Sequence, residues 1–169
     1  METPSWALSV SFWLHMLATV SWVGGQAVIS LLIIPIGRKM LSGDAFSNFM
    51  AKINQRMRSI AWVSFTVLIA TGLIQISADQ AHDGFLSLQT NWGVAILIKL
   101  LVFGGILALT AYQTWGLSPI IERSALLQSR GKNIPVSMET LHKRENITLW
   151  INFSLSIIVL LLTAIARIS

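Results

Sequence analysis

Residues Phe12 to Gln26 have the sequence FWLHMLATVSWVGGQ. It lies inside a longer apolar segment at residues 6–35 and carries one titratable side chain, His15. A helix needs about 20 apolar residues to cross roughly 30 Å of hydrocarbon, so this segment predicts a membrane span. Ionisable side chains inside spans are costly and usually mark functional sites. His15 is therefore the first candidate functional residue.

Three further apolar segments, at residues 60–78, 92–117 and 147–165, are long enough to span a membrane. Hydrophobic residues make up 54% of the 169-residue chain and charged residues 11%, against roughly 25% charged in soluble domains. Long unbroken apolar runs do not fit the alternating strands of a membrane barrel. We predict the all-α class, with residues 1–169 forming a single four-helix transmembrane bundle.

Positive charge gathers in two of the loops between these segments, whereas the N-terminal stretch and the loop after the second span have no Lys or Arg. The basic residues are Arg38, Lys39, Lys52, Arg56 and Arg58 in one loop, and Arg123, Arg130, Lys132, Lys143 and Arg144 in the other. Cytoplasmic loops of membrane proteins are enriched in these residues. We therefore expect both termini outside, on the periplasmic side of a bacterial inner membrane, and no nucleic-acid partner for the net charge of +5.

Each predicted span carries polar residues along one helical face. They are Ser11, His15, Thr19, Trp22 and Gln26 in the first span, Ser64, Thr71 and Gln75 in the second, Trp92, Lys99, Phe103, Thr110 and Gln113 in the third, and Asn152, Ser156 and Thr163 in the fourth. Small polar side chains commonly hydrogen-bond across membrane helices, so most of these residues have a structural interpretation. His15 and Lys99 stand apart because they are ionisable, although a neighbouring helix could satisfy a neutral imidazole and a lysine could extend to the interface.

A weak internal repeat relates the first and third spans. Pro35 lies twenty residues after His15, and Pro119 lies twenty residues after Lys99. We expect both prolines to end their helices, as in a parallel duplication. His15 and Lys99 would then lie at similar depth, and whether their faces meet depends on packing. We also expect residues 41–57 to form an amphipathic segment along the interface and residues 126–146 to form a polar loop.

Five motifs run through nearly the whole chain: LHMLATVSWVGG, ATGL, WGVAILIKLL, TAYQTWGLSPIIERS and KREN. They resemble the copper-resistance-D (CopD-like) membrane family and, more distantly, HemJ-type protoporphyrinogen oxidases. The resemblance implies that His15 and Lys99 are functional, with Trp22, Gly24 and Gly25 in support. The sequence departs from the HemJ type in two places. Gln113 stands where that type tends to carry a histidine, and no proline follows Asn146 in the motif that opens the last span.

Three functions fit these residues, and whether the protein is an enzyme stays open. Our main hypothesis is a haem-associated redox or accessory subunit, with His15 ligating haem b and with Lys99, Trp22, Phe103 and Gln26 completing the cofactor site. The alternative is copper transport or resistance, with His15 and Met16 as metal ligands. The third is a structural subunit held by other membrane proteins or by further copies of this chain. The absence of cysteine excludes thiolate ligands in each case.

Overall fold

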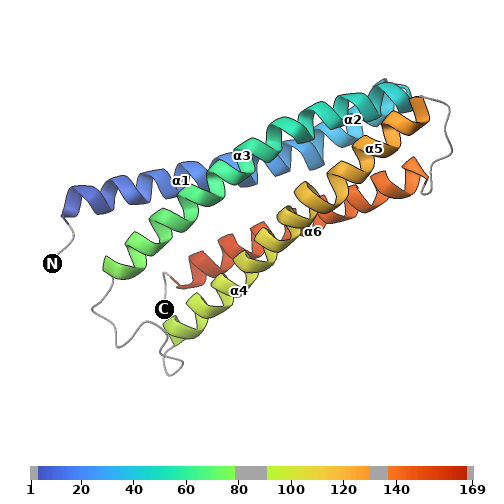
Figure 1. Ribbon diagram of the computed structural model, residues 1–169. Coiled ribbons are helices and arrows are strands. Elements are labelled where there is room, and N and C mark those ends of the chain that lie inside the picture. The colour runs from blue at the N-terminus through green and yellow to red at the C-terminus, as the bar shows by residue number, and fades with distance from the viewer. Residues whose placement is uncertain (1–3, 79–90, 130–136, 167–169) are drawn as a thin grey trace. The chain divides into compact units, whose positions relative to one another are not determined.

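The computed structural model describes residues 4–78, 91–129 and 137–166. Within those ranges every regular element is helical, so the predicted all-α class is confirmed. The elements are α1 (Ser5–Val28), η1 (Ile29–Ile33), α2 (Ile34–Met40), α3 (Gly43–Ala78), α4 (Asn91–Ala111), η2 (Tyr112–Leu117), α5 (Ser118–Ser129) and α6 (Met138–Ala166), where η denotes a π-helical turn. Figure 1 shows these helices along the chain.

Four stretches of helix are long and apolar enough to cross a membrane. They are Ser5–Met40, Ala45–Ala78, Leu97–Leu127 and Met138–Ala164. Large apolar side chains along them are exposed, Trp13 at 63% and Leu101 at 68% among them. Such surfaces suit hydrocarbon, and helices satisfy their own backbone hydrogen bonds there. The protein is an integral membrane protein, as the sequence predicts.

The prediction that the two prolines end their helices is wrong. The π turn η1 ends two residues before Pro35, and η2 ends two residues before Pro119; both helices then continue, into α2 and α5. In these turns the backbone N–H of Ile34 donates to the carbonyl of Ile29, and that of Ser118 donates to the carbonyl of Gln113. A π turn bonds residues five apart and widens the helix. The wider turn leaves room for the ring of each proline, so the helix continues past it.

The two segments expected outside the spans are largely helical. Residues 43–57 form the first part of the continuous helix α3 and not a separate interfacial segment. The reason is packing, since the ring of Phe46 lies against Gly37 of α2 and Met50 is buried. Of residues 126–146, residues 126–129 belong to α5 and residues 138–146 to α6, so these parts are helix and not loop. Residues 130–136 lie outside the described ranges.

The chain divides into two compact units between Val94 and Ala95. In the first unit, α1, η1 and α2 form one long helix that packs along α3 (Figure 1). In the second unit, α4, η2 and α5 form another that packs against α6, around a core of Leu117, Ile121 and Leu141. Each unit is thus a helical hairpin, and the prediction of a single four-helix domain stays a prediction.

Candidate functional site

The polar face of α1 meets a polar face of α3 in the first unit. The hydroxyl of Ser11 donates to the backbone carbonyl of Thr71 at 3.3 Å. One turn later, His15 Nδ1 lies 2.8 Å from Thr71 Oγ1. Thr71 Oγ1 lies 2.6 Å from the carbonyl of Val67 and 3.3 Å from that of Leu68, both on its own helix. His15 is therefore joined to the neighbouring helix through a threonine hydroxyl.

These distances favour one direction for the hydrogen bond between His15 and Thr71. A threonine hydroxyl has one proton, and the Val67 carbonyl receives it. With its proton on the Val67 carbonyl, Thr71 Oγ1 accepts from His15 Nδ1–H, and the lone pair of the neutral imidazole then lies on Nε2. Histidines that bind metals usually have this arrangement, in which one ring nitrogen donates to a protein acceptor and the other holds the metal.

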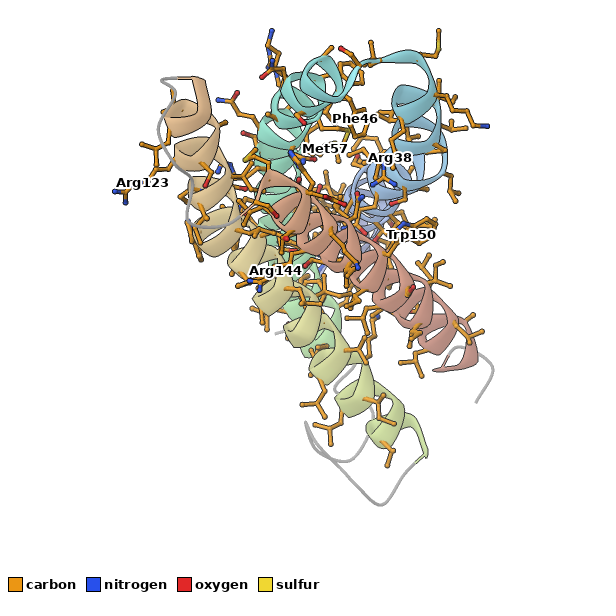
Figure 2. All side chains as sticks on the ribbon, turned by 90° about the vertical axis from the view of Figure 1, so that its right-hand side faces the viewer. Arg38, Phe46, Met57, Arg123, Arg144 and Trp150 are labelled. Carbon is orange, nitrogen blue, oxygen red and sulfur yellow. The ribbon has the colours of Figure 1, made fainter. Side chains whose placement is uncertain are left out.

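Further along α1, towards its C-terminal end, the two helices pack through aromatic rings and a close approach to the backbone. Trp22 is buried, and its ring centroid lies 4.6 Å from that of Phe65. At Gly25, a Cβ atom would lie 2.5 Å from the terminal methyl carbon of Met57 and 3.5 Å from its sulfur. The Met57 thioether therefore lies against the backbone of α1. Figure 2 labels Met57 on α3.

Sequence reasoning missed Met57 as a candidate ligand. The methionines are scattered along the sequence, whereas the structure brings Met57 against the helix that carries His15. The signal was present in the seven-residue spacing of Met50 and Met57, which places both on one face of a helix. Met16, the sulfur ligand expected from the sequence, is 66% exposed. It follows His15 directly, so the two side chains project about 100° apart around the helix.

The other predicted site residues fall in both units. Gln26 lies with His15 and Trp22 on α1, and it is 3% exposed. Lys99 and Phe103 lie on α4 in the second unit, and both are partly buried. A site shared by His15 and Lys99 stays a prediction. Among the described residues, no group of three or more His, Asp and Glu side chains could hold a metal ion.

The second unit has its own buried polar contact. Asn152, at 0% exposure, donates from Nδ2 to Thr110 Oγ1 at 2.9 Å. The Thr110 hydroxyl in turn lies 2.9 Å from the carbonyl of Ile106 on its own helix and donates to it. Near the start of α6, His142 Nδ1 lies 3.4 Å from a carboxylate oxygen of Glu145. The buried part of this unit is thus joined by an amide and a hydroxyl.

Fold and site together define a membrane protein of four helical spans, with a histidine held in a defined orientation inside the first hairpin. Comparison with protein families gives the particular family. The family model described as copper resistance protein D (CopD) matches residues 51–166, more than half of the chain. The chain belongs to the CopD family.

The matched residues include Thr71, Lys99 and Asn152, whereas His15 lies on α1, before they begin. No match was found among curated proteins or among solved structures. The family membership favours the copper alternative over the haem hypothesis, and the more distant similarity to HemJ-type oxidases stays a prediction.

Proposed function

We propose that this protein binds copper within the membrane and moves it across, with Nε2 of His15 as a nitrogen ligand. The observation that carries the proposal is the hydrogen bond from His15 Nδ1–H to Thr71 Oγ1. It keeps the imidazole in the tautomer whose Nε2 lone pair can bind a metal. Imidazole is a suitable copper ligand. The CopD family supports copper as the metal.

Met57 is the sulfur ligand that fits this proposal best. Thioethers are soft ligands and select Cu(I). The Met57 side chain lies against Gly25 of α1, the helix that carries His15, whereas Met16 is two-thirds exposed beside the lipid-facing residues of that helix. Copper would thus meet a nitrogen ligand and then a sulfur ligand along one pair of helices.

The orientation of the protein in the membrane rests on the charge pattern of its loops. Arg38 and Lys39 lie in the last turn of α2. Positive charge at one end of a span favours the cytoplasmic side. We place this end in the cytoplasm of a bacterium and the end nearer His15 outside, so that copper moving inward would pass His15 before Met57.

The test is copper binding by the purified protein in lipid nanodiscs, measured by competition for Cu(I) with a coloured chelator. In His15→Asn, the amide Nδ2 takes the position of Nδ1 and can still donate to Thr71, but no nitrogen remains at the position of Nε2. In His15→Ala both are lost. We expect both variants to lose more affinity than the roughly 10–100-fold typical of outer-shell substitutions.

His142→Ala is the matched control, because it removes a histidine from the second unit. We expect it to bind copper as the unaltered protein does. Unchanged binding in His15→Asn would show that Nε2 is no ligand. A Soret band in the purified protein that disappears in His15→Ala would replace copper by haem, for which one imidazole is a sufficient axial ligand.

A further inference from the structure

Three buried polar side chains form a row on the first long helix: Trp22, Gln26 and Ser30. Their exposed fractions are 6%, 3% and 3%. Trp22 Nε1, Gln26 Oε1 and Ser30 Oγ have no hydrogen-bond partner among the residues that the structure describes. Successive members are four residues apart, so they follow one side of the helix, which for Ser30 is the π turn η1.

Such a row needs an occupant inside a membrane. A buried polar atom without a hydrogen bond costs free energy, and hydrocarbon offers it no partner. The three atoms are a donor, an acceptor and a group that does both. A step of four residues along a helix rises about 6 Å, close to the reach of two hydrogen bonds in line. The backbone spacing of the row is thus of the size that one bridging water spans, and a water molecule can both donate to Gln26 Oε1 and accept from Trp22 Nε1.

The backbone beyond Ser30 offers further hydrogen-bonding capacity. Pro35 has no N–H, so the turn before it contains a carbonyl that lacks its helical donor. The π turn η1 lies immediately before this proline, and π turns inside helices frequently occur at functional sites. Backbone acceptors and the Ser30 hydroxyl therefore lie together near the end of the span that carries Arg38.

The opposite side of the same turns is apolar and exposed. Val28, Leu31 and Leu32 are 47%, 53% and 53% exposed, and they lie at the same depth as Gln26 and Ser30. Polar and apolar residues thus lie on two different sides of this helix. A protein partner around the whole helix is not needed to explain the buried polar row. Small polar occupants fit the polar side, and lipid chains fit the apolar side.

We propose that Trp22, Gln26 and Ser30 hold a file of water molecules that runs along the first unit to the π turn before Pro35. This hydrated strip is a binding site for water inside the bilayer. Its role as the route by which copper leaves the hairpin rests on the proposed function. The presence of water does not.

The absence of cysteine from the chain allows a direct test, since each introduced thiol is the only one present. N-ethylmaleimide crosses membranes but reacts with the thiolate, which forms only where water is present. Ser30→Cys changes little in size, and Leu31→Cys is its matched control at the same depth on the apolar side. We expect Ser30→Cys in nanodiscs to react at least about tenfold faster than Leu31→Cys.

A second pair, Gln26→Cys and Val28→Cys, repeats the comparison one turn earlier, with far-UV circular dichroism and size-exclusion chromatography as folding checks. Equal rates within both pairs would overturn the proposal. The outcome is separable from the copper proposal. Fast labelling at residue 30 with copper binding intact in His15→Asn would retain the strip and reject the copper site, and the reverse pattern would do the opposite.

Discussion

Within each hairpin, the two helices are joined by the same arrangement of hydrogen bonds, but the donor differs. In each, a threonine hydroxyl donates to a carbonyl of its own helix, Thr71 to Val67 and Thr110 to Ile106. The same oxygen then accepts an N–H from the other helix. In the first unit the donor is the imidazole of His15, and in the second it is the amide of Asn152.

The two donors differ in the group that remains available once the hydrogen bond is made. An amide and an imidazole serve equally as donors to a threonine oxygen. After donating, however, the imidazole of His15 retains a nitrogen lone pair that can bind a soft or borderline metal, whereas the amide of Asn152 retains only a harder oxygen. The second hairpin therefore shows what the contact does as structural glue, and the first shows what the histidine adds.

The largest effect is expected from a charge placed in the contact of the second unit. An ionised carboxylate at residue 152 has no proton to donate, and the proton of Thr110 is engaged with Ile106. Asn152→Asp therefore sets two acceptors against each other at a position with 0% exposure. We expect a loss of about 3 kcal/mol or more in the free energy of unfolding, measured by denaturation in mixed detergent micelles. A loss below about 1 kcal/mol would mean that the new carboxyl is protonated and donates to Thr110, or that water reaches this contact.

The next largest effect separates the two threonines. Thr71→Val removes the acceptor that orients His15, and outer-shell partners of metal ligands typically contribute 10–100-fold to affinity. We expect Cu(I) affinity to fall by about that factor in Thr71→Val. Thr110→Val removes the equivalent hydroxyl from the second unit and should leave copper affinity unchanged. An equal fall in both variants would show that the hydroxyls act through stability and not through the orientation of His15.

The four spans and their polar faces were predictable from the sequence because both follow from local properties. Span length follows from apolar composition, and Ser11, Trp22, Gln26, Asn152 and Ser156 are buried as the helical spacing requires.

The partner of His15 was not predictable in this way. It depends on the register between α1 and α3, which no local pattern sets, so Thr71 could be placed on a polar face but not opposite His15. The same holds for Met57 against Gly25. The prediction at the two prolines was wrong because a proline usually ends a helix. A π turn that accommodates a proline has no characteristic sequence by which it could be predicted.

A smaller effect is expected at the close approach in the first unit. Replacing either adjacent glycine by alanine improves helix propensity. At Gly25, however, the new Cβ would lie 2.5 Å from the methyl carbon of Met57, whereas at Gly24 nothing lies within 4 Å. Because the thioether is flexible, we expect Gly25→Ala to be less stable than Gly24→Ala by about 1 kcal/mol in the free energy of unfolding.

A double variant tests whether Met57 causes this difference in stability. The double variant Gly25→Ala, Met57→Ala removes the thioether that the new Cβ would meet, so the effect of Gly25→Ala in that background should match the effect of Gly24→Ala. Equal stability of the two single variants would place the Met57 side chain away from α1 and would remove it from the copper proposal.

The smallest effect is expected from Asn152→Leu, which tests whether the second contact is needed at all. The substitution removes one hydrogen bond, but it also removes Oδ1, a buried acceptor with no partner among the described residues. Thr110 keeps its bond to Ile106. Hydrogen bonds between membrane helices average about 0.6 kcal/mol, so we expect the free energy of unfolding to change by less than about 1 kcal/mol. A loss comparable to that of Asn152→Asp would show that Oδ1 binds something in the folded protein, and the second hairpin would then carry a site of its own.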